Sequence, residues 1–316
     1  MKAWIINRYG GQEVLEFSNI EKPEIKVGKI LVEVHSVSLN PYDYKIRNGI
    51  AKIMTGNKFP IVLGGDFAGV VVESKDKKGS FTPGQEVYGF ANIFFREQGA
   101  LAEFTSISPK YVRLLPKNVS LLNACAIPSA GLTALNGLQK CGDYKNKKVL
   151  INGATGGIGH LATQIVVAKG GIVTAVCSTK NVELAKELGA SKVIDYNTNN
   201  IFDDNDLYDV IYDAAAKLTY SQVKKHLNKS GTYCTTQEGI KVNAQSILSV
   251  FNSRSSMSLS SFRGKMEDFE ELETLMSSNG VKPYFKNAFT FDEVDKAFEL
   301  LENGGFIGKL VIKVKE

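Results

Sequence analysis

Cysteine and histidine are scarce in this sequence. Its 316 residues include four cysteines and three histidines, and no Cys-x-x-Cys pair occurs. Disulfide-stapled folds and structural zinc sites need closely spaced thiols, so these counts argue against both kinds of site. Reduced thiols are typical of the cytoplasm, which is the location that we predict for the protein.

Long apolar runs and a strong net charge are also missing. No stretch approaches the roughly 20 apolar residues that a membrane span needs. The opening MKAWIINRYGG lacks the apolar core of a signal peptide and the Arg/Ser richness of a transit peptide. The net charge is +5, and the densest basic clusters, 75–78 and 145–148, lie beside turn residues. We therefore expect no membrane span, and no nucleic acid as the main partner.

Two patterns of apolar residues divide the chain. Residues 1–122 hold short β-like runs separated by glycine and proline, which predicts a β unit with one short helix near PYDYKIRNG. From about residue 123 strands and helices alternate, which predicts βαβ units and a parallel sheet. The final helix, glycine turn and strand could return to the first unit. The predicted strands of the second part are 148–152, 172–177, 192–196, 208–214 and 231–236, and the predicted helices are 157–169, 181–188 and 219–227.

A glycine cluster, 153–159, joins the strand 148–152 to the next helix. Glycine lets the backbone turn tightly and approach an anion, and the helix points its free N–H groups and positive dipole end at that anion. Strand, loop, helix and second strand follow in order, which favours a dinucleotide site over a structural turn. No GxxxxGK[ST] motif occurs, which excludes an NTPase P-loop.

A second pattern in this region is misleading. The glycine spacing is similar to that of short-chain dehydrogenases, and Tyr220 and Lys224 stand at the spacing of that family's YxxxK pair. In that family the glycines lie near the N-terminus and the tyrosine follows far downstream, whereas here a whole domain precedes the glycines. We therefore interpret Tyr220 and Lys224 as a coincidence on one helix.

Several blocks in a fixed order identify a different family. They are SVSLNPYDYKIRNG (36–49), FPIVLGGDFAGVVVE (59–73), GQEVYGF (84–90), GALAEFTSI (99–107), IPSAGLTALNGL (127–138), INGATGGIGHLATQIVVAKG (151–170) and ELGASKVIDY (187–196). Together they resemble the medium-chain dehydrogenase/reductase superfamily, in its zinc-independent quinone oxidoreductase (zeta-crystallin-like) branch. The resemblance implies an α/β protein with a GroES-like β domain, 1–122 completed by 267–316. It also implies a Rossmann NADP-binding domain with a doubly wound parallel sheet, 123–266.

The positions that match the catalytic zinc ligands of related alcohol dehydrogenases depart from the family's pattern. They hold Asn40, Gly65 and Ser129, none of which supplies a thiolate or an imidazole. Without a metal ion to stabilise an alkoxide, the chemistry must suit substrates that accept hydride readily. Quinones and α,β-unsaturated carbonyl compounds meet that condition.

Four residues near the predicted short helix are candidates for the substrate site. Asn40 could donate its amide to a substrate carbonyl, and it could also cap the helix that begins at Pro41. Lys45 could supply a proton or contact the substrate oxygen, or it could be a solvated lysine. Tyr42 and Tyr44 could line a quinone slot, although packing in the core explains them equally well.

The segment after the second strand of the parallel sheet distinguishes NADPH from NADH. NAD sites usually carry a carboxylate there, which accepts the ribose hydroxyls and repels a 2′-phosphate. Here no carboxylate occurs before Glu183. Ser178 can donate a hydrogen bond, and the cation of Lys180 is unfavourable at a helix N-terminus unless an anion binds there. We therefore predict NADPH, with Ser178, Lys180 and Asn181 as contacts.

The remaining predicted cofactor contacts come from the glycine loop and from the resemblance. The loop residues are expected to hold the pyrophosphate. The resemblance implies that Thr133 contacts the nicotinamide end and that Tyr196 contacts the 2′-phosphate. The loop residues are Ala154, Thr155, Gly156, Gly157 and Ile158.

These observations and the resemblance predict an NADPH-dependent reductase that transfers hydride to small-molecule quinones or enones without zinc. Two alternatives stay open: an enoyl-thioester (enoyl-CoA/ACP) reductase, and a non-catalytic NADPH-binding protein of the crystallin-like or RNA-binding kind. Relatives pair the edges of their Rossmann domains, and SSMSLSSF (255–262) is a β-like stretch rich in small residues. We therefore expect a homodimer.

Overall fold

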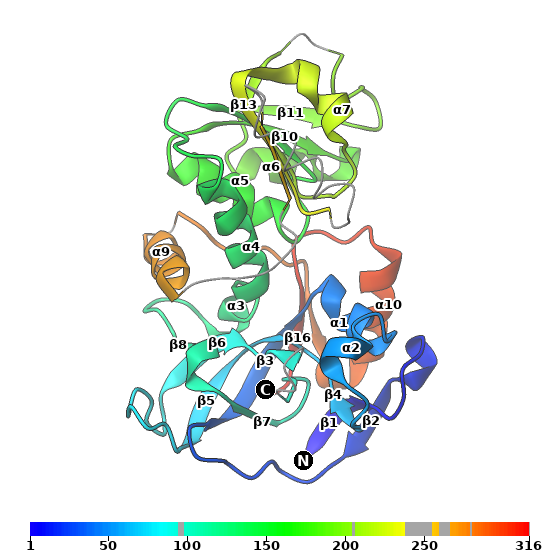
Figure 1. Ribbon diagram of the computed structural model, residues 1–316, viewed down its shortest axis with the longest axis vertical. Coiled ribbons are helices and arrows are strands. Elements are labelled where there is room, and N and C mark those ends of the chain that lie inside the picture. The colour runs from blue at the N-terminus through cyan, green and yellow to red at the C-terminus, as the bar shows by residue number, and fades with distance from the viewer. Residues whose placement is uncertain (94–97, 204–205, 238–254, 259–265, 279, 316) are drawn as a thin grey trace. The chain divides into compact units, whose positions relative to one another are not determined.

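The computed structural model divides the chain into two compact units (Figure 1). It describes all residues except 94–97, 204–205, 238–254, 259–265, 279 and 316. The first unit is Met1–Ser129 with Phe285–Glu316, and the second is Ala130–Tyr284. Within the described ranges no helix is both long enough and apolar enough to cross a bilayer.

Antiparallel strands build most of the first unit. A seven-stranded sheet has the order β15-β16-β3-β5-β6-β8 with β7 beside β3, and a three-stranded sheet has the order β2-β1-β4. The strands are β1 (Lys2–Ile6), β2 (Glu16–Asn19), β3 (Ile30–Leu39), β4 (Ile61–Val62), β5 (Asp66–Ser74), β6 (Glu86–Phe90), β7 (Phe104–Ile107), β8 (Val112–Leu114), β15 (Ala288–Thr290) and β16 (Leu310–Lys313). The helices of this unit are α1 (Pro41–Arg47), α2 (Lys52–Thr55), α3 (Leu121–Ala124) and α10 (Val294–Asn303).

The C-terminal segment completes the first sheet, as its sequence predicts. The red strand β16 pairs antiparallel with the blue strand β3, with Leu310 opposite Leu39 (Figure 1). The predicted short helix is α1, and the buried guanidinium of Arg47 anchors it to α10 through two hydrogen bonds to the Glu302 carboxylate, at 2.7 and 2.9 Å. The apolar side chains of β3, β5, β6, β16 and α10 form one core.

A parallel sheet forms the second unit. Its order is β11-β10-β9-β12-β13-β14, and each neighbouring pair is parallel. Numbered along the chain this is the order 3-2-1-4-5-6 of a doubly wound Rossmann sheet, so the predicted fold class is confirmed. The strands are β9 (Lys148–Asn152), β10 (Ile172–Cys177), β11 (Lys192–Asp195), β12 (Tyr208–Asp213), β13 (Leu227–Thr235) and β14 (Ser255–Ser258), and the helices are α4 (Pro128–Gln139), α5 (Gly159–Ala168), α6 (Val182–Glu187), α7 (Tyr220–Val223) and α9 (Met266–Ser277).

One predicted helix of the second unit is wrong in its extent. The helix expected over 219–227 consists of the four residues of α7 and a 3-10 turn over Lys224–His226. The strand expected from 231 already begins at Leu227, which pairs with Tyr208 ahead of a register irregularity. Leu227 and Val223 are both buried in the core of this unit, and that tertiary burial overrides the helical pattern.

The limits of the compact units differ from the predicted domain limits of 122/123 and 266/267. Helix α3 packs on strands β3, β5 and β6 of the first unit. Helix α9 belongs to the second unit, where its Glu271 accepts hydrogen bonds from Lys169 of that unit and from Gln139 (2.7 Å). With α3 in the first unit and α9 in the second, the units divide at 129/130 and 284/285.

Candidate active site

Asn40 lies where strand β3 meets helix α1. Proline is favoured at the first position of a helix, and α1 begins at Pro41 with Asn40 at its N-cap, as predicted. The Asn40 backbone N–H donates to the Asp43 carboxylate at 2.7 Å. The Asn40 side chain is buried.

Four polar residues surround Asn40, of which Tyr42 is partly buried and the others are buried. We call the whole group the Asp66 cluster: Asn40, Tyr42, Asp66, Ser129 and Lys309. The fully buried Asp66 carboxylate accepts the Asn40 amide at 2.9 Å and the Ser129 hydroxyl at 2.5 Å. The Ser129 backbone N–H lies 3.1 and 3.2 Å from the two carboxylate oxygens. Lys309 donates to the Leu39 carbonyl at 3.0 Å and to the Asn40 amide oxygen at 2.5 Å. Asn40 and Ser129, which stand at positions that match zinc ligands in relatives, thus both donate hydrogen bonds to the Asp66 carboxylate.

The third zinc-position residue, Gly65, leaves space that a tyrosine fills. A Cβ atom added to Gly65 would lie 1.7 Å from the Tyr42 hydroxyl oxygen, so a side chain fits there only if the Tyr42 ring moves. The same hydroxyl lies 3.3 Å from the Ser129 hydroxyl. Within the described residues, no group of three or more His, Cys, Asp or Glu side chains is arranged to hold a metal ion. At the three positions that match zinc ligands the protein has the Asn40 amide, the Ser129 hydroxyl and, at Gly65, no side chain.

Burial governs the charges in and beside the Asp66 cluster. It raises the pKa of Asp66, and it lowers the pKa of Lys309, because both lie out of reach of water. The opposite charges of this pair counteract both shifts. Burial also raises the pKa of Asp43 to about 7 and raises the pKa of Tyr42 well above its usual range. Tyr42 is therefore a neutral phenol near pH 7, able to donate a hydrogen bond.

The structure places the other predicted substrate residues on α1. Tyr44 is partly buried and packs against the core of the first unit, as does the ring of Tyr42. Lys45 is partly exposed in the last turn of α1. The proposed contacts of Tyr44 and Lys45 with a substrate stay predictions.

The glycine loop shows which glycines shape the backbone and which leave room. Gly153 has a φ of 76°, in the left-handed region that glycine adopts without strain. A Cβ atom on Gly159 would lie 2.0 Å from the Gly153 carbonyl oxygen, so the first turn of α5 can pack on the loop only with glycine there. A Cβ atom on Gly156 would meet a single atom, at 3.4 Å. Gly156 therefore leaves space beside its Cα atom, and α5 begins two residues later than predicted.

Polar residues follow the carboxyl ends of the neighbouring strands β10 and β11. Cys177 pairs with Asp195, so Ser178 and Tyr196 follow at the same sheet edge. Ser178 is buried, whereas Lys180 is exposed and Tyr196 is 54% exposed. The Asn181 amide donates to the Thr155 hydroxyl at 3.2 Å, which ties this segment to the glycine loop. The predicted residues for the pyrophosphate and the 2′-phosphate thus converge on one edge, as a dinucleotide requires.

Two further positions complete this edge of the second unit. Thr133 lies on α4 and is partly buried. Its backbone carbonyl accepts a hydrogen bond from the Tyr212 hydroxyl at 3.2 Å. The buried Asp213 carboxylate ends β12 and accepts hydrogen bonds from the Asn152 amide and the Leu218 N–H, both at 2.8 Å. Asp213 therefore ties β12 to β9. The rejected Tyr220 packs in the core of this unit.

Sequence reasoning missed Asp66 and Lys309. Asp66 stands within a β-like block as GGDFAG, and Lys309 directly precedes the mostly apolar run LVIKV. A lysine at the edge of such a run ordinarily lies in solvent. One sequence signal could have pointed to Asp66: it is an acidic residue directly after Gly65, and Gly65 matches a metal ligand in relatives.

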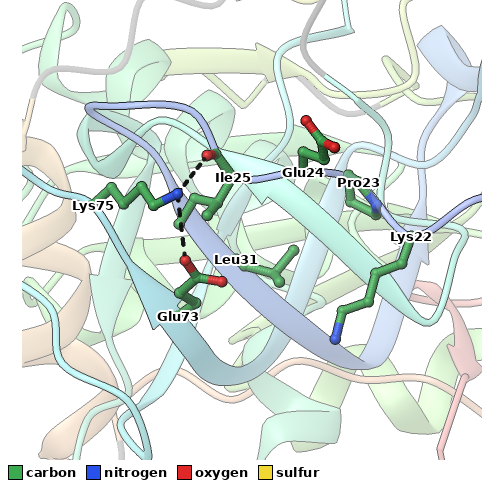
Figure 2. A pocket seen from close by; sticks show the side chains of 7 residues that line it. All are labelled: Lys22, Pro23, Glu24, Ile25, Leu31, Glu73 and Lys75. Carbon is green, nitrogen blue, oxygen red and sulfur yellow. Dashed lines mark hydrogen bonds and ion pairs between the residues drawn. The ribbon is translucent and has the colours of Figure 1, made fainter.

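A shallow hollow elsewhere in the first unit does not form a comparable site. It has a volume of about 390 Å³ and lies between the segment 22–25 and strands β3 and β5. Figure 2 shows the Lys75 ammonium directed at the Ile25 carbonyl (3.1 Å) and the Glu73 carboxylate (3.6 Å). Of its two lysines, Lys75 is thus engaged by these groups, and the Lys22 ammonium lies over the Phe104 ring.

An antiparallel GroES-like unit joined to a Rossmann sheet defines a two-domain dehydrogenase/reductase. Residues 26–117 match the model of the alcohol dehydrogenase GroES-like domain, and residues 188–312 match that of the zinc-binding dehydrogenases. The chain belongs to the medium-chain dehydrogenase/reductase family and is an oxidoreductase.

Relatives and a solved structure cover the whole chain. It is 36% identical to 2-methylene-furan-3-one reductase of Solanum lycopersicum and 35% identical to the chloroplastic NADPH-dependent alkenal/one oxidoreductase of Arabidopsis thaliana. Each match covers 99% of this chain and 79% of the relative. The quinone oxidoreductase of Coxiella burnetii has a similar structure, with a TM-score of 0.90 at 30% identity, covering 100% of this chain and 99% of the other.

Proposed function

We propose that this protein is an NADPH-dependent reductase that transfers hydride to quinones or α,β-unsaturated carbonyl compounds without a catalytic zinc ion. The observation that carries the proposal is the Asp66 cluster. At the zinc positions of related enzymes it has an amide and a hydroxyl held on one carboxylate, and the Tyr42 hydroxyl occupies the space that a side chain at Gly65 would need. The names of the relatives, an enone-type reductase and a quinone oxidoreductase, support the substrate class.

Asn40 and Tyr42 would stabilise the negative charge that develops on the substrate oxygen. One hydrogen of the Asn40 amide forms a good hydrogen bond with the Asp66 carboxylate, at 2.9 Å. The other contacts of the amide nitrogen are long: 3.3 Å to the Ser38 carbonyl and 3.4 Å to the Tyr42 hydroxyl. The second amide hydrogen can therefore be redirected to a substrate oxygen at little cost. Donors fixed before the reaction act most strongly in a dry site.

The second unit fits NADPH. The space at Gly156 and the N-terminal amides of α5 suit a pyrophosphate. Ser178 and Lys180 lie after β10 without a carboxylate before Glu183, and Tyr196 follows the neighbouring strand at the same edge. When bound, the reduced nicotinamide supplies the hydride. The protein residues orient the acceptor and hold its oxygen, and Lys45 is the candidate proton source.

A steady-state panel tests the proposed function. NADPH oxidation is measured with benzoquinone, naphthoquinones, short and long enones, and crotonyl-CoA. We expect turnover with quinones or enones and much less with crotonyl-CoA. Preference for crotonyl-CoA would indicate an enoyl-thioester reductase. NADPH binding without turnover of any acceptor would indicate a non-catalytic protein.

We also propose a cytoplasmic homodimer. Strand β14 is the last strand of the described part of the parallel sheet, and its free edge can pair with a second copy. The four cysteines are scattered without Cys-x-x-Cys spacing, which supports a reducing compartment. Light scattering that gives the monomer mass of 34.5 kDa would contradict the dimer. Cell fractionation that finds the protein in an organelle would contradict the cytoplasmic location.

A further inference from the structure

Lys309 is a buried cation with an unusual set of partners. Its residue is only 4% exposed, and its position follows from the register of the sheet, because Leu310 is paired with Leu39. The residue before Leu310 therefore faces the residue after Leu39, which is Asn40. A buried ammonium loses its hydration and persists only where charged or polar groups replace the water. Here those groups are the Asn40 and Leu39 oxygens and the nearby carboxylates of Asp66 and Asp43.

The two ends of the Asn40 amide contact groups of opposite character. An ammonium can only donate and an ionised carboxylate can only accept. Lys309 donates to the amide oxygen at 2.5 Å, and Asp66 accepts from the amide nitrogen at 2.9 Å. Rotating the amide by half a turn would place its oxygen against Asp66 and its N–H groups against Lys309. The pair therefore selects one of the two amide orientations, which directs the nitrogen toward Tyr42.

We propose that Lys309 is a positioning residue for reduction, which acts by holding the Asn40 amide with its N–H groups toward the side where the substrate oxygen binds. This inference rests on the proposed function of Asn40. Lys309 itself need not touch substrate, because its ammonium contacts the opposite end of the amide. Its effect on turnover must consequently disappear when the Asn40 amide is absent.

A double-mutant cycle on the full-length protein tests this dependence. The variants are Lys309→Met, Asn40→Ala and both together, with Lys313→Met, at the exposed end of strand β16, as the matched control. We expect Lys309→Met to lower kcat by about tenfold and to leave the Kd for NADPH within about twofold. In the Asn40→Ala background the same substitution should change kcat by less than about twofold. Additive losses would overturn the proposal.

A readout independent of activity follows the Asn40 amide directly. Its side-chain NH₂ signal in a ¹⁵N-correlated NMR spectrum is assigned by its loss in Asn40→Ala. We expect Lys309→Met to shift that signal strongly, and Lys313→Met to leave it in place. Lys309→Arg keeps a donating cation and should retain more turnover than Lys309→Met. It also serves as the second variant if the methionine variant does not fold.

The two proposals fail differently. A strong NMR shift in Lys309→Met with unchanged kcat in Asn40→Ala would refute the catalytic role of Asn40 in the proposed function, while the structural pairing stands. An unchanged NMR signal in Lys309→Met would overturn the positioning role, whatever the activity of Asn40→Ala.

Discussion

The titration of Asp43 should make the first unit less stable as pH rises. Burial raises the pKa of this carboxyl to about 7 from an ordinary value of 3.8, with Asp66 adding to the shift and Lys309 opposing it. Between these two values the folded chain keeps a proton that the unfolded chain releases. The stability that this proton provides is therefore complete below about pH 4 and is lost as pH rises through 7.

The expected magnitude follows from the two pKa values. For a single site, a shift from 3.8 to about 7 gives a loss of about 2.5 kcal/mol between pH 5 and pH 8. Asp43→Asn keeps an oxygen that can accept the Asn40 N–H but cannot titrate. The difference in the free energy of unfolding between the variant and the wild type should therefore rise by that amount over this pH range.

The single tryptophan makes this measurement specific to the first unit. Trp4 is buried in the core of that unit, and its indole N–H donates to the Phe291 carbonyl at 2.7 Å. Urea unfolding followed by Trp4 fluorescence at pH 5, 6, 7 and 8 gives the free energies. Comparison with Asp43→Asn cancels the titration of groups common to both proteins. A difference that stays constant from pH 5 to pH 8 would refute the reasoning.

Four further predictions concern the metal, the amide, the cofactor and the backbone. The purified protein should hold no stoichiometric zinc and keep its activity with chelators; elemental analysis that finds about one zinc per chain would contradict this. Asn40→Ala should lower kcat by about tenfold or more and change the Kd for NADPH less, in steady-state and binding assays; an unchanged rate would leave Asn40 only a cap. The wild type should prefer NADPH over NADH by about tenfold in kcat/KM, and Ser178→Asp should abolish that preference; a variant that still prefers NADPH would exclude Ser178 from the 2′-phosphate site. Ala216 has a φ of 56°, so Ala216→Gly should stabilise the protein by about 1 kcal/mol in urea unfolding followed by circular dichroism, and a loss of stability would show that the strain is absent.

Local features of the chain were predictable because neighbouring residues cause them. The glycine loop between β9 and α5, Pro41 at the first position of α1 and the absence of a carboxylate after β10 are all visible as short patterns. Each depends on backbone freedom, a fixed φ angle or a charge within a few residues. The alternation of strands and helices likewise predicted the parallel sheet. The predicted helix over 219–227 failed because burial of Leu227 against β12, a tertiary effect, extended the strand β13.

The partners within the Asp66 cluster could be recognised only from the tertiary structure. The sequence placed Asn40, Gly65 and Ser129 at zinc positions by resemblance, and it determined that no thiolate or imidazole stands there. It contained no local sign that Lys309, which is 269 residues from Asn40, would be buried against its amide. That contact exists because β16 pairs with β3 in one register, and a shift by one residue would turn the flanking side chains to the other face. The sequence by itself determines which residue types are present. The pairing of strands far apart in the sequence determines which partner orients each polar group of this cluster.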